Sequence, residues 1–313
     1  MPRILTVTPN PALDLATSAE VLLDASKIRC EPARIDPGGG GINVARVVHR
    51  LGGEVLALYL AGGATGARLR GLLDAEGLAS HCIDIAGETR ESFSVWERAT
   101  GREFRFVLPG PELAPGEWQA GLDAVARLAP PGGYLVSSGS LPPGTPADFH
   151  AEAARRARAV GCRVVVDASG ESLAAALAVG VDLVKPSLRE LREFTGLPLA
   201  SEADRLAAAR ALVASGQAAI VALSLGAEGA LLVARDLALR AAPLTVEVAT
   251  TTGAGDSFLA GMVCALARNE PLAEAFRTGM AAGAAALLRP GTALSRAQDV
   301  QQLRQAVRIA ELS

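Results

Sequence analysis

The chain alternates short, nearly continuous apolar runs with segments of helical spacing over much of its 313 residues. Runs of this kind are typical of strands buried on both faces, and the helices between them indicate a largely parallel sheet covered by helices. The predicted strands are Ile4–Thr8, Val55–Ala61, Tyr134–Ser138, Arg163–Asp167, Asp182–Lys185 and Ala219–Leu225. The predicted helices are Gly41–Leu51, Gly66–Ala75, Glu117–Ala129, Ala147–Val160 and Glu202–Ser215. The sequence therefore predicts an α/β fold.

Two regions break this pattern, residues 13–36 and residues 91–108. They contain alternating segments such as Ser92-Phe93-Ser94-Val95-Trp96, and no helix separates their strands, so we expect antiparallel strands in a small separate sheet. Because the two regions are not consecutive, this sheet would be a flap inserted into a single domain that spans residues 1–313. A small isolated sheet cannot bury all its apolar side chains, so we also expect two flaps to pair in a homodimer.

Composition excludes several classes of partner. The net charge is −3 and there is no basic block, which argues against a nucleic-acid partner. The longest apolar stretch, Met280 to Leu288, is shorter than the roughly 20 residues that span a bilayer, so it reads as a buried helix and no membrane partner is expected. Four scattered cysteines without metal-like spacing, and no signal-peptide pattern ahead of them, predict a cytoplasmic protein with reduced thiols.

The segment Gly253-Ala254-Gly255-Asp256 carries the strongest chemical signal. It lies between a strand-like stretch, Leu244–Val248, and an apolar run of helical spacing that starts at Phe258. A glycine-rich turn that opens a helix directs free backbone N–H groups at one point and suits an anion. A carboxylate beside such a turn is what phosphoryl transfer to an alcohol requires. An aspartate at a helix start is also a common cap, so these residues alone leave both interpretations open.

Other loops after predicted strands add to a cleft. Gly38 to Gly41 allow close approach of the backbone to a ligand, and Asn43 can bond hydroxyl groups, although a hinge loop is the alternative. Asp14 follows the first strand, at the end where open α/β folds bind ligands, although an exposed loop aspartate would look the same. Similar loops are Ser138–Gly144, Lys185–Ser187 with Glu190 beyond it, and Ser224–Gly229.

Several cations belong to the flap regions. Arg90 and Arg105 flank one region, and Lys27 and Arg29 lie in the other. A single surface arginine is usually only solvated, but several cations over a glycine-rich cleft indicate an anionic substrate. The histidines His49, His81 and His150 show no spacing typical of a metal site or a triad, so we interpret them as structural or exposed.

Together these stretches resemble the PfkB, or ribokinase-like, family of carbohydrate kinases, from Thr8 to about Leu294. The matching motifs, in order, are Gly38–Asn43, Lys185–Pro186, Ser224–Gly229 and Gly253–Asp256. The resemblance implies a three-layer α/β/α domain with a small antiparallel β lid. It also implies ATP-dependent phosphorylation of a hexose phosphate with Mg²⁺ as a further cofactor. Fructose 6-phosphate, a glycolytic substrate, is the favoured acceptor, and fructose 1-phosphate or tagatose 6-phosphate is the alternative.

The resemblance also implies a role for each matching residue. Asp256 would be the catalytic base, and Gly253, Ala254 and Gly255 would form the anion hole. Asp14, Gly39, Gly40 and Asn43 would hold the sugar, and Arg90, Arg105 and Ser140 would hold its phosphate. Lys185, Ser187, Ser224, Gly226 and Gly229 would line the ATP site, and Glu190 would act indirectly on magnesium.

The chain departs from the family pattern at several positions. Ser187 stands where the family usually has Asn, and Thr250 stands where many relatives have an Asp that helps a monovalent cation, so potassium is an optional cofactor. The opening Thr8-Pro9-Asn10-Pro11-Ala12-Leu13-Asp14 looks like the fructose 1-phosphate branch. Gly40 favours fructose 6-phosphate instead, because relatives in the other two branches often carry Lys there.

Two other classes of protein fit the sequence less well than a kinase. A dinucleotide-binding oxidoreductase needs a G-x-G-x-x-G motif directly after a strand, whereas Gly38–Gly41 follows a flap segment. A sugar-phosphate sensor on the same fold would be recognised by loss of the base, and Asp256 is present.

Overall fold

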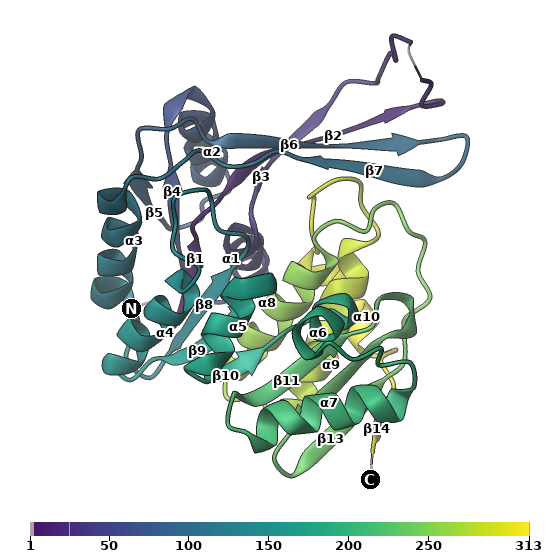
Figure 1. Ribbon diagram of the computed structural model, residues 1–313. Helices are drawn as coiled ribbons and strands as arrows, with labels where there is room; N and C mark the ends of the chain where they lie inside the picture. Colours follow the sequence, from purple (N-terminus) through teal and green to yellow (C-terminus); the bar gives the residue numbers. More distant parts are fainter. Residues whose placement is uncertain (1–2, 25, 313) are drawn as a thin grey trace.

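A ten-stranded sheet forms the body of the protein in the computed structural model, which describes residues 3–24 and 26–312. Its parallel part runs in the order β11 (Ala218–Ser224), β10 (Val181–Val184), β9 (Arg163–Asp167), β8 (Tyr134–Ser138), β1 (Ile4–Thr8), β4 (Val55–Ala61) and β5 (Ser80–Asp84). At one edge β12 (Ala230–Ala234), β13 (Leu237–Ala241) and β14 (Ile309–Glu311) continue it antiparallel. The predicted α/β class and mainly parallel sheet are confirmed (Figure 1).

Helices cover both faces of this sheet. On one side lie α1 (Gly40–Arg50), α2 (Gly63–Ala75), α8 (Ala254–Ala267), α9 (Leu272–Ala286) and α10 (Ala297–Arg304). On the other lie α3 (Pro115–Leu128), α4 (Phe149–Ala159), α5 (Gly170–Ala178), α6 (Leu188–Thr195) and α7 (Glu202–Ala214). Successive residues of β1 divide between the two cores: Ile4 packs on the first side and Leu5 on the second. That alternation makes the body three-layered, since central strands such as β1 and β8 bury both of their faces.

The predicted elements match the structure closely where the apolar pattern is strong. Four of the six predicted strands have the predicted bounds, and β10 and β11 differ from theirs by one residue at each end. Met280 to Ala286 belong to α9, and no helix of the described ranges is long and apolar enough to cross a membrane.

A further stretch that looked strand-like in the sequence does not form a strand. Residues 244–248 are irregular and mostly exposed. Strand β14, from the C-terminal end of the described chain, pairs with β13 in place of this segment, despite the segment's alternating pattern.

A second, smaller sheet forms the lid. It contains β3 (Arg34–Gly38), β2 (Ala12–Ala19), β6 (Arg90–Glu97) and β7 (Arg102–Val107), in that order. The outer pairs β3–β2 and β6–β7 are antiparallel as predicted, whereas the central pair β2–β6 is parallel. The parallel pairing arises because β2 and β6 follow body strands β1 and β5, which run in the same direction. In Figure 1 the lid projects as a long ribbon beyond the body.

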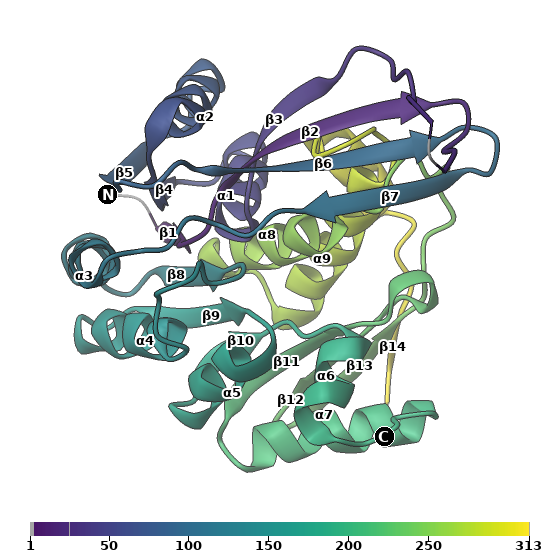
Figure 2. The ribbon, with the colours of Figure 1, turned by 45° about the horizontal axis from the view of Figure 1, so that its top comes forward.

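The two faces of the lid differ in chemistry. Side chains alternate across a strand, so Asp14, Ser92 and Arg105 share the face toward the body, where they line a cleft. Their neighbours Phe93 and Phe106 lie on the opposite face, stacked with ring centroids 4.7 Å apart and 40% and 45% exposed. Figure 2 shows the lid from a direction in which its strands lie across the view. The lid thus presents polar groups inward and an apolar surface outward.

Candidate active site

A cleft of about 390 Å³ lies between the lid and the carboxyl ends of the body strands. Parallel strands end at the same edge of a sheet, so the loops after β1, β8, β9 and β10 meet here. The cleft is lined by many of the residues predicted from sequence, namely Asp14, Gly39, Gly40, Asn43, Arg90, Arg105, Ser140, Lys185, Glu190, Gly253, Gly255 and Asp256. Residues far apart in the chain therefore converge on one site.

The turn before α8 presents backbone donors to this cleft. Gly253 has a φ of 77°, a left-handed conformation that suits glycine, and it caps the helix. The first helical hydrogen bond runs from the Ser257 N–H to the Gly253 carbonyl, at 2.9 Å. The N–H groups of Ala254, Gly255 and Asp256 precede that bond, so they are the free donors expected at a helix N-terminus. Together with the helix dipole they can stabilise an anion.

Asp256 lies half-buried beside these donors. Burial raises the pKa of its carboxyl group, although a hydrogen bond from Asn43 and the charges of Lys185 and Arg105 act in the opposite direction. The Asn43 Nδ2 atom donates to Asp256 Oδ2 at 2.8 Å. This bond connects the first turn of α1, after the glycine run, to the first turn of α8. The position and raised pKa of Asp256 suit a general base.

A lysine and two further carboxylates line the cleft near Asp256. Lys185 Nζ lies 3.2 Å from Asp167 Oδ1, and the Lys185 side chain is only 6% exposed. Burial lowers the pKa of Lys185, but the charges of Asp167, Asp256 and Glu190 outweigh burial and raise it, so the lysine is cationic. Burial raises the pKa of Asp167 to about 6. This part of the cleft can therefore bind phosphate through Lys185 and can contact a metal through carboxylates.

The glycine run forms one wall of the cleft, next to Asp14. A Cβ atom on Gly40 would lie 2.3 Å from Ser138 Oγ, so a side chain at position 40 would force Ser138 to move. Gly39 has a φ of 109°, which also requires glycine. Burial raises the pKa of the Asp14 carboxyl group to about 6. A hydrogen bond from Thr292 and the charges of nearby arginines lower this pKa, but burial has the larger effect.

The two lid arginines differ in their surroundings. Arg90 donates to the backbone carbonyls of Leu108 and Asn10, at 3.0 and 3.1 Å, and its buried Nε has no partner in the described part of the chain. Arg105 is exposed to the cleft, and its guanidinium makes no ion pair or hydrogen bond to any described residue. The free donors of Arg105 make it the better candidate for direct contact with an anionic ligand.

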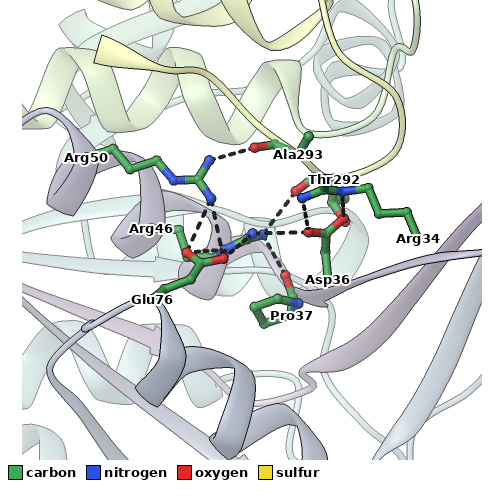
Figure 3. Close-up of polar contacts among 8 residues, drawn as sticks. All are labelled: Arg34, Asp36, Pro37, Arg46, Arg50, Glu76, Thr292 and Ala293. Atoms are coloured by element: carbon green, nitrogen blue, oxygen red, sulfur yellow. Dashed lines mark hydrogen bonds and ion pairs between the residues drawn. The ribbon is translucent and has the colours of Figure 1, made fainter.

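A buried ion cluster holds the base of the lid in place. Arg46 of α1 is fully buried and donates to the carbonyls of Pro37 and Thr292, at 2.8 and 3.1 Å. It also contacts Glu76, with a shortest distance of 2.6 Å, and Asp36, at 3.5 Å. Figure 3 shows this cluster, which also contains Arg34, Arg50 and Ala293. It fixes the end of β3, directly before the glycine run.

His150 is structural, in agreement with the interpretation from sequence. It is fully buried on α4, and burial lowers its pKa to about 4, so the ring is neutral. Its Nδ1 lies 2.7 Å from Ser137 Oγ and its Nε2 lies 3.2 Å from the Gly139 carbonyl. The ring therefore supports the loop that carries Ser140, whose hydroxyl accepts a hydrogen bond from Asn10 Nδ2 at 3.1 Å.

Some predicted residues lie outside the lining of the cleft. Ser187 caps α6, where its hydroxyl accepts from the Glu190 N–H and the Glu190 carboxylate accepts from the Ser187 N–H. Ser224 pairs with Ser187 through an isolated bridge, and Gly226 and Gly229 form the turn that follows. The other predicted residue outside the lining is Ala254. Lys27 and Arg29 are exposed and also lie outside it.

Sequence reasoning missed several residues of the cleft. Asp167 ends a correctly predicted strand at the carboxyl edge, so the rule applied to Asp14 could have identified it. Thr251 and Thr252 also line the cleft, next to predicted residues, whereas Ser138 and Gly139 belong to a loop that the sequence had already assigned to the cleft. Glu103 gave no signal, because its importance depends on the packing of β7 against a loop almost 150 residues away.

Comparison with known proteins agrees with this geometry. The model of the pfkB family carbohydrate kinases matches residues 11–299, and the chain belongs to this family. The chain is 45% identical to the ATP-dependent 6-phosphofructokinase isozyme 2 of Mycobacterium tuberculosis, over 96% of this chain and 88% of that protein. It is 38% identical to the 1-phosphofructokinase of Xanthomonas campestris, over 84% of each chain.

Solved structures extend the comparison. Phosphofructokinase-2 from Escherichia coli in complex with fructose-6-phosphate superimposes with a TM-score of 0.92 and 39% identity, over 98% of this chain and 99% of that chain. The same E. coli protein has been solved in complex with potassium, with a TM-score of 0.93, 40% identity and the same coverage. The ribokinase-like fold and the assignment as a sugar kinase rest on these findings together with the cleft.

Proposed function

We propose that the chain is a single kinase domain, residues 1–313, that transfers the γ-phosphoryl group of ATP to fructose 6-phosphate to give fructose 1,6-bisphosphate. One observation carries the proposal: the carboxylate of Asp256 lies beside the free N–H groups of α8, in the same cleft as Arg105 of the lid. The names of the M. tuberculosis and E. coli relatives support it.

In the proposed reaction Asp256 accepts the proton of the acceptor hydroxyl. The hydroxyl oxygen then forms a bond to the γ-phosphorus while the bond between that phosphorus and the β–γ bridging oxygen breaks, and ADP leaves. The N–H groups of Ala254 and Gly255 stabilise the charge on the moving phosphoryl group. Asn43 holds Asp256 in position, and Asp14 accepts hydrogen bonds from sugar hydroxyls.

The proposal assigns the nucleotide and the metal to the body of the protein. Lys185, Ser187, Ser224, Gly226 and Gly229 would hold ATP, and Asp167 and Glu190 would contact Mg²⁺ through water. Among the described residues no group of three or more His, Cys, Asp or Glu side chains could hold a metal by itself. That fits Mg²⁺, which is usually bound by one or two carboxylates, water and substrate phosphates, and which neutralises phosphate charge.

The choice of acceptor rests on Gly40 and Ser138. Because Ser138 Oγ fills the space beside Gly40, no cationic side chain can extend from position 40, and the phosphate must be bound elsewhere. The proposal assigns it to Arg90 and Arg105 of the lid, as expected for a 6-phosphate. Fructose 1-phosphate or tagatose 6-phosphate is the alternative, favoured by the opening sequence and by the X. campestris relative.

The test is a comparison of kcat/KM for fructose 6-phosphate, fructose 1-phosphate, tagatose 6-phosphate and free fructose with ATP. The proposal predicts that fructose 6-phosphate is preferred. If fructose 1-phosphate is preferred, the phosphate-binding role of the arginines stands and the argument from Gly40 is wrong. Preference for free fructose would contradict the phosphate-binding role as well.

The proposal also includes a homodimer formed through the outer face of the lid. Phe93 and Phe106 are exposed there, and Arg102 covers only the ring of Phe104, with its guanidinium carbon 5.1 Å from the centroid. Pairing two lids would bury this apolar surface. Sedimentation velocity should show a dimer, and Phe93→Ser with Phe106→Ser should dissociate it with loss of activity. A fully active monomer at assay concentration would exclude the dimer as a requirement.

Two further parts of the proposal concern the cellular compartment and a monovalent cation. The chain acts in the cytoplasm, where ATP and sugar phosphates are available and where its four free cysteines stay reduced. Potassium activates the enzyme, a proposal supported by the potassium complex of the E. coli protein. Equal initial rates in potassium chloride and in tetramethylammonium chloride would remove potassium from the proposal. Export of the native protein to the medium would contradict the proposed cytoplasmic location.

A further inference from the structure

A lid carboxylate contacts the loop that leads into the anion hole. Glu103 lies on β7, two residues from Arg105 and therefore on the same face of the strand. Its Oε1 atom accepts hydrogen bonds from the Thr250 hydroxyl at 2.9 Å and from the Thr252 hydroxyl at 3.3 Å. Its Oε2 atom accepts from the N–H and the hydroxyl of Thr251, both at 3.1 Å. One side chain thus binds all three threonines.

The three threonines immediately precede Gly253, which starts the anion hole. Thr250 and Thr252 are buried, and the Thr252 N–H donates to the Thr250 hydroxyl at 3.1 Å. The segment before them, residues 244–249, has no regular secondary structure. The loop is therefore held on its amino side by the Ala249 N–H, which donates to the Leu287 carbonyl at 2.7 Å, on its carboxyl side by α8, and from the lid by Glu103. The contact with Glu103 thus links the lid to the residues directly before the free N–H groups of α8.

We propose that Glu103 is a positioning residue, which locks the loop Thr250–Thr252 to the lid so that the anion hole is complete only when the lid is closed over substrate. This inference rests on the proposed function, in which Arg105 binds the phosphate of the sugar. Arg105 and Glu103 share one strand face, so a phosphate that draws Arg105 toward the body draws Glu103 onto the threonines. Phosphoryl transfer is thereby coupled to the presence of the acceptor sugar.

The kinetic test compares Glu103→Ala with Glu91→Gln, a change at an exposed lid carboxylate that makes no hydrogen bond to any described residue. Loss of several charge-assisted hydrogen bonds should lower kcat on the order of 10- to 100-fold in Glu103→Ala. The KM for ATP should stay within about threefold, because the nucleotide site is untouched. The control should match the unmodified protein. A kcat of Glu103→Ala within about twofold of the control would overturn the proposal.

A double variant separates positioning from general weakening of the lid. Thr251→Val removes one hydroxyl donor to Glu103 at an exposed position. If the two residues act through one contact, the kcat loss of Glu103→Ala with Thr251→Val should equal that of Glu103→Ala alone. Multiplication of the two separate losses would contradict the shared contact.

Hydrogen exchange tests the contact without turnover. The Thr251 N–H is bonded to Glu103, so a peptide spanning residues 249–255 should exchange faster in Glu103→Ala than in Glu91→Gln. Fructose 6-phosphate should slow this exchange in the control and not in Glu103→Ala. Equal exchange in both variants would overturn the role of Glu103. An unmodified protein that fails to phosphorylate fructose 6-phosphate would instead contradict the proposed function, while the exchange comparison still decides whether Glu103 holds the loop.

Discussion

The body sheet and the lid sheet are built from similar strands, yet their faces meet different surroundings. In the body both faces are covered by helices, and central strands such as β1 and β8 are buried along their whole length. In the lid one face lines the cleft and the other exposes Phe93 and Phe106. The body therefore supplies a rigid base for Asp256, Asp167 and Lys185, and the lid supplies the cation Arg105 and the carboxylate Glu103. We infer that the body carries phosphoryl transfer and the lid carries recognition of the sugar phosphate.

This division of roles predicts that a body variant loses kcat. Asp256→Asn keeps the size of the side chain and its contact with Asn43 but removes the base, so kcat should fall by roughly 10²–10⁴ or more, while the KM values for ATP and sugar phosphate change little. Steady-state kinetics with both substrates checks this. Asp236→Asn, at an exposed turn between β12 and β13, is the matched control. A variant that retains a tenth or more of the kcat of the unmodified protein would remove Asp256 as the base.

Acidification should affect the sugar-binding carboxylate at the lid. In the proposed function Asp14 binds sugar hydroxyls as a carboxylate, and burial raises its pKa to about 6. Below that pH it is protonated, so kcat/KM for the sugar phosphate should fall about tenfold between pH 7 and pH 5. The raised pKa of the half-buried Asp256 means that protonation of this carboxylate should also lower kcat as the pH falls. A kcat/KM profile that stays flat down to pH 5 would show that neither carboxylate limits the reaction in that range.

The same carboxylate should weaken the folded state. A pKa raised from 3.8 to about 6 means that ionised Asp14 is less favourable in the folded than in the unfolded chain. The loss of folding free energy caused by ionised Asp14 grows as the pH rises from about 4 to about 6, and it is complete above pH 6. Asp14→Asn should therefore raise Tm by a few degrees at pH 7.5, on the order of 1–3 kcal/mol, and the gain should vanish near pH 4. A lower Tm than that of Asp236→Asn at pH 7.5 would contradict this.

Sequence alone predicted the body better than the lid. Strands buried on both faces, such as β1 and β9, leave continuous apolar runs whose ends are clear. The parallel pairing of β2 with β6 was not predicted, because it depends on the directions of the body strands β1 and β5 that precede them. Those two strands are far apart in the sequence. The strand expected at residues 244–248 failed because its pattern does not reveal that β14 occupies the neighbouring edge.

The candidate site followed the same rule. Residues in local motifs, such as Gly253 and Asp256, could be predicted because the motif carries its own geometry. Asp167 could also have been predicted, because it ends a predicted strand at the carboxyl edge of the sheet, where open α/β folds bind ligands. Glu103 and Arg46 could not be predicted, because their partners come from segments brought together only by the fold.

The most direct test of the division between lid and body is the selectivity for the phosphate group in Arg105→Ala. The ratio of kcat/KM for fructose 6-phosphate to that for free fructose should fall roughly 10- to 150-fold, because a charge-assisted hydrogen bond contributes about 1.5–3 kcal/mol and only the phosphorylated sugar loses it. Arg102→Ala, on the opposite face of β7, should leave the ratio unchanged. If both sugars lose kcat/KM equally in Arg105→Ala, the lid does not recognise the phosphate and the account is contradicted.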